Sequence, residues 1–248
     1  MYVVGYPKSG NTWLCFLMAY CLNAEYDDLD APGIHPTNEY QRRYVKGGFA
    51  RVSYQDRLGK ILKTHRQDLK EISAKDTVVY LVRDGRDVMV SYYFFKNTYF
   101  NPRNLPWLKR LLLPIRRLLS SDIQTRTQQQ GFSSFLQQHV DEWVTHISTW
   151  LKRQPTAIVR YEDLKTDPAT TLQRLFAKLD VKVAPEIIEQ ALSIFDFKQL
   201  SQRQEGEEDR KSFFRKGIVG DWQNHFSETD IQFFERKAEK IMQQLGYE

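Results

Sequence analysis

The chain alternates short apolar runs with longer segments in which apolar residues recur every three or four positions. Residues 77–82 (Thr-Val-Val-Tyr-Leu-Val) form a continuous apolar run, as is typical of interior strands in parallel sheets. This alternation predicts a single α/β domain with a central parallel β-sheet flanked by helices. The predicted strands are residues 1–4, 60–64, 77–82 and 156–160.

The helical segments are recognised by their apolar period and by the residues that stop them. Residues 12–22 are apolar on most sides, which predicts a buried helix, and the helix over 133–151 ends before Pro155. Residues 202–210 are polar and charged and are expected to form a mobile loop. The predicted helices are residues 12–22, 87–95, 133–151, 169–179, 185–193 and 228–245.

Composition narrows the class of protein. With 248 residues, 41% hydrophobic and 27% charged, the chain is globular. No run approaches the ~18 apolar residues of a membrane span, and the first 30 residues lack the pattern of a secretory leader. Two cysteines, Cys15 and Cys21, fit neither a disulfide framework nor a zinc site, so we expect a cytoplasmic protein.

The net charge of +5 comes from one segment. Residues 97–121 contain five basic residues and no acid, and without them basic and acidic residues balance at 31 each. Nucleic-acid binders normally carry a broad basic face, so we expect no nucleic-acid partner. The five basic residues of this segment are Arg103, Lys109, Arg110, Arg116 and Arg117.

The first predicted strand runs directly into a glycine-bearing loop at residues 5–12, which read Gly-Tyr-Pro-Lys-Ser-Gly-Asn-Thr. A loop of this kind before a helix presents backbone N–H groups and the positive end of the helix dipole to a phosphate or sulfate. Gly5 and Gly10 have the spacing of a Walker A loop, but Asn11 stands where that motif has lysine. The strand at 77–82 leads into Arg83, an anion-binding residue, where a nucleotide hydrolase needs a magnesium-binding carboxylate.

Four segments in this order resemble the sulfotransferases that use 3′-phosphoadenosine 5′-phosphosulfate (PAPS). Residues 6–13 (Tyr-Pro-Lys-Ser-Gly-Asn-Thr-Trp) resemble the family's 5′-phosphosulfate loop, and residues 82–93 resemble its 3′-phosphate segment. Residues 160–164 (Arg-Tyr-Glu-Asp-Leu) and 215–222 (Arg-Lys-Gly-Ile-Val-Gly-Asp-Trp) match two further family segments. The resemblance implies one sulfotransferase domain over residues 1–248, and an enzyme of the EC 2.8.2 type that transfers a sulfuryl group in line.

The resemblance also implies a binding site for PAPS, used without a metal. Lys8 would offset the charge that gathers on the departing 5′-phosphate, and Arg83 with Ser91 would hold the 3′-phosphate. Tyr161 would contact the nucleotide, and Phe197 is a candidate for stacking on adenine. Arg86 and Asp87 are expected to form a structural pair or cap. The full set of donor-binding residues implied is Lys8, Ser9, Gly10, Asn11, Thr12, Trp13, Arg83, Ser91, Tyr161, Phe197, Arg215, Lys216 and Gly217.

His65 is the candidate general base. It stands where the family places the histidine that takes the acceptor's proton, and an ordinary imidazole pKa near 6.5 suits that task. Lys63, in the same Lys-Thr-His segment, is also implied to be catalytic. Here the segment continues Arg-Gln, where many relatives continue Leu-Pro. His139 and His146 lack further metal-ligand residues and are expected to be structural.

The acceptor is expected to be a small or lipid-like molecule with a hydroxyl group, or an amine. Residues 97–130 form a basic lid or insert for which three interpretations remain: a lid helix, a helix at the membrane surface through residues 103–119, or a site for an acidic acceptor or partner chain. Residues 223–229 depart from the dimer motif common in cytosolic relatives, so the oligomeric state stays open.

Two other functions compete with sulfuryl transfer. A P-loop kinase or nucleotidase would require ATP and Mg²⁺, and Asn11 in the Walker lysine position argues against it. A non-catalytic module that binds a phosphoadenosine ligand or a membrane surface needs no base, and the presence of both Lys8 and His65 argues against it.

Overall fold

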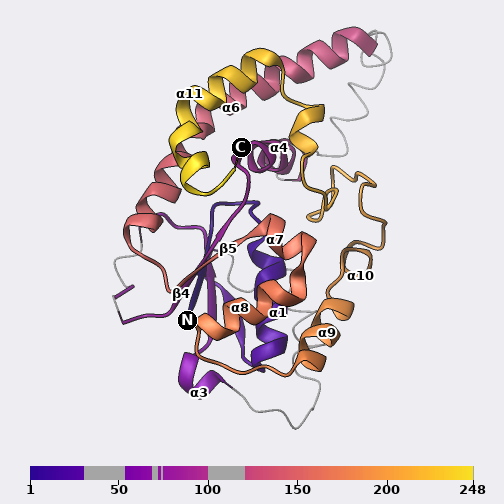
Figure 1. Ribbon diagram of the computed structural model, residues 1–248. Helices are drawn as coiled ribbons and strands as arrows, with labels where there is room; N and C mark the ends of the chain where they lie inside the picture. The colour runs from indigo at the N-terminus through magenta and orange to yellow at the C-terminus, as the bar shows by residue number, and fades with distance from the viewer. Residues whose placement is uncertain (31–53, 69–71, 74, 100–120, 248) are drawn as a thin grey trace. The chain divides into compact units, whose positions relative to one another are not determined.

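The computed structural model describes residues 1–30, 54–68, 72–73, 75–99 and 121–247 (Figure 1). Its contacts divide the chain into two compact units, each built from two stretches of sequence. Unit 1 comprises Met1–Arg83 and His146–Leu200, and unit 2 comprises Asp84–Thr145 and Ser201–Glu248.

Unit 1 contains a five-stranded sheet in the order β2-β3-β1-β4-β5, in which neighbouring strands pair in parallel. The predicted α/β class with a parallel sheet is therefore confirmed. Val3 lies opposite Lys63 on one side and Val79 on the other, which places β1 in the middle. The strands are β1 (Tyr2–Val4), β2 (Tyr26–Asp28), β3 (Ile61–Thr64), β4 (Val78–Val82) and β5 (Ala157–Arg160).

Helices flank this sheet, as the sequence predicts. Helix α1 contacts β1, β2 and β3 as well as α9, which explains why all of its residues except Trp13 are buried. Helices α7 and α8 contact β5, and Figure 1 shows α1, α7 and α8 beside the strands. The helices of unit 1 are α1 (Asn11–Leu22), α3 (Gln55–Leu58), α7 (Tyr161–Thr166), α8 (Pro168–Lys178), α9 (Pro185–Ile194) and α10 (Phe197–Ser201), whose last residue belongs to unit 2.

Unit 2 is helical in its described residues. Its core is aromatic: Trp143 packs against Phe234, and Phe226 packs against Phe132 and Phe234. Helix α11 has a capping box at Ser227 and Asp230. The elements are α4 (Gly85–Phe94), the π-helix η2 (Phe95–Tyr99), α6 (Ser121–Lys152, of which residues 146–152 belong to unit 1), the 3₁₀ helix η4 (Asp221–Asn224) and α11 (Glu228–Gln244).

Strand β2 and the first turns of α6 are absent from the sequence prediction, each for a physical reason. Strand β2 reads Tyr-Asp-Asp, and aspartate is depleted in strands, but Asp28 is buried beside Lys63. Residues 121–132 are mostly polar and show no apolar period, so α6 was predicted to begin only at residue 133.

Candidate functional site

The carboxyl ends of four neighbouring strands carry the candidate site residues of unit 1. Strand β1 ends at Val4, before the loop that contains Lys8, and β3 ends at Thr64, before His65. Strand β4 ends at Val82, before Arg83, and β5 ends at Arg160, before Tyr161. Ligands of open parallel α/β sheets bind at this edge, so the topology gathers these residues where binding is expected.

The loop between β1 and α1 is shaped by two residues in the left-handed region. Lys8 has φ of 70° and Gly10 has φ of 104°. Gly10 is the N-cap of α1, and the helix has neither a side-chain cap nor an acidic residue in its first turn. The first turn of α1 therefore keeps its partial positive charge for an anion.

Gly10 also has a packing requirement. A Cβ atom at this position would lie 2.7 Å from Cδ2 of Tyr161, which is too close for any side chain. The ring of Tyr161 also lies 4.3 Å from the guanidinium carbon of Arg83. Arg83 is buried and donates from Nη1 to the carbonyl oxygen of Lys8 at 3.4 Å. The structure thus brings Lys8, Gly10, Arg83 and Tyr161 together.

Asn11, in the Walker lysine position, connects this loop to His65. Its Nδ2 donates to the carbonyl oxygen of Gly5 at 2.9 Å and lies 3.0 Å from Nδ1 of His65. A Cβ atom at Gly5 would overlap Oδ1 of Asn11, so this arrangement requires glycine. The sequence predicted a donor-binding role for Asn11 but gave no sign of its contact with His65.

The ring of His65 has a defined tautomer. Its Nδ1 has two neighbours, the carbonyl oxygen of Gly5 at 2.7 Å, which can only accept, and Nδ2 of Asn11 at 3.0 Å, which can only donate. We assign the proton of the neutral ring to Nδ1 on the shorter contact, so that Nδ2 of Asn11 donates to the carbonyl of Gly5 and not to the ring. Nε2 then carries the lone pair. Burial, with a contribution from Lys63, lowers the pKa of His65 to about 3. The imidazole is therefore neutral at pH 7 and able to accept a proton.

Lys63 is held in a buried ion pair. Its Nζ lies 2.5 Å from Oδ2 of Asp28, and both side chains are 4% exposed. Burial alone would raise the pKa of Asp28, but the charge and hydrogen bond of Lys63 hold it below its usual range. Sequence reasoning missed Asp28, because a carboxylate in an unpredicted strand gives no signal of burial.

Trp13 lies beside Tyr161, with ring centroids 6.1 Å apart, and its Nε1 donates to the carbonyl oxygen of Phe195 at 2.8 Å. Phe195 stacks on Phe16. Phe197 is the first residue of α10, and its stacking on adenine stays a prediction.

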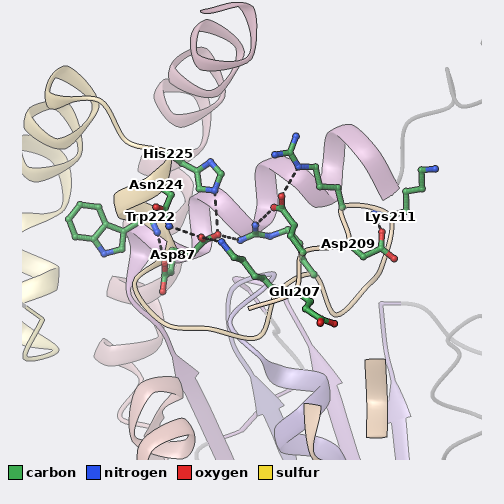
Figure 2. Close-up of polar contacts among 12 residues, drawn as sticks. Asp87, Glu207, Asp209, Lys211, Trp222, Asn224 and His225 are labelled. Atoms are coloured by element: carbon green, nitrogen blue, oxygen red, sulfur yellow. Dashed lines mark hydrogen bonds and ion pairs between the residues drawn. The ribbon is translucent and has the colours of Figure 1, made fainter. Parts of the chain in front are cut away.

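The Arg-Lys-Gly segment of unit 2 is organised around Asp221. Arg215 and Lys216 lie 2.5 Å and 2.6 Å from the oxygens of this buried carboxylate. Figure 2 shows Asn224 and His225, which also contact Asp221. Burial alone would raise the pKa of Asp221, but the hydrogen bonds from His225, Lys216 and Arg215 hold it far below its usual range.

Two segments of unit 2 have contacts that the sequence did not indicate. Arg86 pairs with Asp84 at 2.7 Å, and Asp87 accepts from the backbone N–H groups of Gly220 and Trp222 (Figure 2). Residues 202–210, expected to form a mobile loop, have hydrogen bonds to residues 214–216, and their mobility stays a prediction. Arg203 donates to the carbonyl oxygens of Phe214 and Arg215, and the N–H of Gly206 donates to the carbonyl oxygen of Lys216.

The implied donor-binding set is divided between the units. Ser91 lies on α4 of unit 2, and its predicted pairing with Arg83 stays a prediction. Unit 1 contains Lys8, Ser9, Gly10, Asn11, Thr12, Trp13, Arg83, Tyr161 and Phe197, together with His65 and Lys63; unit 2 contains Ser91, Arg215, Lys216 and Gly217.

Other expectations fall partly or wholly outside the described residues. Residues 100–120, which carry the basic patch, are among them, so the interpretations of the insert stay predictions. Within the described ranges, no cluster of three or more histidine, cysteine, aspartate or glutamate side chains could hold a metal ion. No described helix is long and apolar enough to cross a membrane.

The chain is similar to known proteins in both sequence and fold. The family model described as "Sulfotransferase domain" matches residues 1–246. Mouse Sulfotransferase 1B1 is 26% identical, over 97% of this chain and 81% of the relative. Guinea pig (Cavia porcellus) 3-alpha-hydroxysteroid sulfotransferase is 27% identical, over 98% of this chain and 83% of the relative. The crystal structure of mouse sulfotransferase SULT7A1 complexed with PAP is similar with a TM-score of 0.62 and 19% identity, covering 98% of this chain and 83% of that one.

Proposed function

The chain belongs to the sulfotransferase family and is therefore a transferase of the sulfotransferase class; from this premise we propose that it transfers the sulfuryl group of PAPS to a hydroxyl, or an amine, of a small or lipid-like acceptor. The observation that carries the proposal is the placement of Lys8, Arg83 and His65 at the carboxyl ends of adjacent strands. In this arrangement Lys8 and Arg83 would supply the positive charge for an anion, and His65 would be a neutral base on the neighbouring strand end.

The residues of unit 1 fit the donor. Gly10 lets the first turn of α1 pack closely against the ring of Tyr161, and α1 begins without an acid that would compete with a phosphate. The cations of Lys8 and Arg83 favour an anionic ligand, and the guanidinium of Arg83 suits bidentate binding of a phosphate. Bound PAPS would supply the sulfuryl group.

Two residues of the chain would do the chemistry. Lys8 would offset the negative charge that develops on the departing 5′-phosphate. His65 would take the proton of the acceptor at Nε2, since Nδ1 carries a proton that it donates to the carbonyl oxygen of Gly5. A nearby anion raises the pKa of an imidazole, so donor binding would move His65 from about 3 toward the range in which a base works best.

Lys63 would act through its charge rather than by direct transfer of a proton. Lys63 forms a buried ion pair with Asp28, and its positive charge contributes to the low pKa of His65. The donor-binding roles of Ser91, Arg215, Lys216 and Gly217 complete the proposal. They rest on the match of residues 82–93 and 215–222 to the family's 3′-phosphate segments.

The acceptor class follows from the relatives. The guinea pig relative is named for a hydroxysteroid, which is a small apolar alcohol. We therefore place a hydroxylated, lipid-like molecule first among acceptors. A kinase has less support, because Asn11 replaces the lysine that a kinase loop places on the β and γ phosphates.

Calorimetry tests the donor assignment. Adenosine 3′,5′-bisphosphate should bind in EDTA, and ATP with Mg²⁺ should bind weakly or not at all. His65→Ala should keep this affinity while abolishing turnover with PAPS and a panel of a phenol, a steroid alcohol and a long-chain alcohol. ATP binding that requires Mg²⁺ would favour the kinase, and turnover by His65→Ala would remove His65 as the base.

A further inference from the structure

Three side chains on one face of the last turns of α6 hold the segment that follows β3. Nε2 of His146 lies 3.1 Å from the carbonyl oxygen of His65. Nε1 of Trp150 donates to the carbonyl oxygen of Arg66 at 3.2 Å, and Thr149 accepts from the side chain of Gln67 at 3.4 Å. Residues 146, 149 and 150 are one helical turn apart, so a single face of α6 contacts three consecutive residues.

The contact from His146 has a fixed direction. A carbonyl oxygen only accepts, so Nε2 of His146 carries the proton and Nδ1 carries a lone pair. Nδ1 lies 2.8 Å from the hydroxyl of Tyr80, which therefore donates to it. Tyr80 is fully buried and His146 is 3% exposed. Burial lowers the pKa of His146 to about 4, which keeps this neutral tautomer at pH 7.

Asp30 binds the backbone of His65 and the side chain of the residue before it through hydrogen bonds. Its backbone N–H donates to Oδ2 of Asp30 at 2.5 Å, and Oδ1 of the same carboxylate accepts from the hydroxyl of Thr64 at 3.2 Å. The amide, the carbonyl and the ring of His65 therefore each have a partner, supplied by Asp30, His146 and Gly5 respectively.

We propose that Tyr80 and His146 are positioning residues, which fix the backbone carbonyl of His65 and so direct its ring toward the acceptor. The inference rests on the proposed function, in which His65 is the base. The hydrogen bonds between α6 and residues 65–67 restrict the backbone of this segment. The expectation from sequence, that His146 is merely structural, omits this contact.

A packing role for the same residues makes a different prediction. The rings of Tyr80 and His146 stack with centroids 5.8 Å apart, and Tyr80 also stacks on Trp150. If packing were their whole contribution, removing the hydroxyl of Tyr80 would affect stability but leave the rate per folded molecule unchanged.

The kinetic test uses Tyr80→Phe, His146→Leu and His146→Gln, with PAPS and an acceptor that the wild-type protein sulfates. Because a displacement of about 1 Å can cost 10²-fold in rate, we expect His146→Leu to lower kcat by roughly 10- to 100-fold and Tyr80→Phe by less. The KM for PAPS and the affinity for adenosine 3′,5′-bisphosphate should stay unchanged. His146→Gln should restore most of the rate, since its amide can donate to the carbonyl of His65. His139→Gln, on the same helix, is the matched control.

A spectroscopic test needs no acceptor. Nitrogen-15 spectra of the histidine rings at pH 7 should show the Nδ1–H tautomer for His65 and the Nε2–H tautomer for His146. In His146→Leu the ring of His65 should lose its single tautomer, and in Tyr80→Phe the same change should be weaker. Tyr80→Phe keeps the bulk of the side chain and so remains informative if His146→Leu does not fold.

The outcomes distinguish failure of His65 as the base from failure of the positioning role of Tyr80 and His146. If His65→Ala retains turnover, the base assignment fails and the positioning role fails with it. If His65→Ala is inactive while folded Tyr80→Phe and His146→Leu keep the wild-type kcat and the His65 tautomer, only the positioning role is overturned.

Discussion

Lys8 combines an unusual backbone conformation with the charge that the proposed chemistry requires. Its φ of 70° lies in the left-handed region, where a lysine costs more than a glycine or asparagine would. The neighbouring loop residues are buried, with Ser9 at 1% and Asn11 at 2% exposure. Such strain is tolerated where the surrounding structure fixes the loop and the side chain has a function.

Lys8→Met removes the charge and keeps the length of the side chain. We expect kcat to fall by about 10²- to 10³-fold, the range found when one stabilising donor of a developing anion is removed. Acceptor KM should change little, and Lys240→Met on the exposed face of α11 should leave the rate unchanged. Steady-state kinetics with saturating PAPS measures the effect. A rate within a few-fold of wild type would remove Lys8 from the chemical step.

His65 and His146 also couple stability to pH. Their folded-state pKa values, about 3 and about 4, lie below the unfolded value near 6.5. The unfolded state therefore binds more protons between these limits. Stability from the two neutral rings is fully present above pH 6.5 and is lost as the pH falls toward 4.

Urea unfolding between pH 6.5 and 4.5 tests this coupling. Each histidine should contribute a slope of up to about 1.4 kcal/mol per pH unit. His146→Gln should have a shallower slope than the wild-type protein over the same range. A free energy of unfolding that does not change across this range would contradict the buried, neutral state of both rings.

At the scale of elements, the sequence predicts the strands that have a clear apolar pattern. It does not predict elements or contacts that depend on residues far apart in the chain. The four predicted strands are all present, because apolar runs in an α/β alternation are a strong signal. Strand β2 is not predicted, because its two aspartates are poor strand formers. The buried ion pair between Asp28 and Lys63 accounts for an aspartate in this strand. Likewise, Asn11, Asp30 and His146 act on His65 through contacts between residues far apart in sequence.

The start of α4 is another feature that only packing explains. A Cβ atom at Gly85 would lie 2.7 Å from atoms of Trp143 on α6 and Phe234 on α11. Both aromatic side chains are fully buried and have little room to move. The glycine allows close approach of three helices within unit 2.

Gly85→Ala should destabilise the protein by about 1–3 kcal/mol, because an added methyl group in a packed core forces neighbouring side chains to move. Gly131→Ala, in the interior of α6, should have a much smaller effect: a Cβ there would lie 3.1 Å from the hydroxyl of Tyr93, which a small shift relieves, and alanine is a better helix former than glycine. Chemical unfolding followed by circular dichroism compares the two. Equal effects from both substitutions would show that Gly85 is not packed as described.

At the scale of the whole molecule, the family domain covers residues 1–246, although contacts divide the chain into two units. The four motif segments could be placed in family order from sequence because each has a distinctive composition. Their division between units could not, since it depends on which distant segments pack together. Arg83 closes the first stretch of unit 1, and Asp84 opens unit 2.

This interleaving has a consequence for the newly synthesised chain. Strand β5 begins at Ala157, so β4 has only β1 as a partner while residues 84–145 are being made. At roughly 5–20 residues per second, the ribosome leaves that strand edge unpaired for several seconds. An unpaired edge can associate with other chains, so this is the interval in which a chaperone would protect the nascent protein. Any contiguous fragment that contains the whole of unit 1 also contains all of residues 84–145, the first stretch of unit 2.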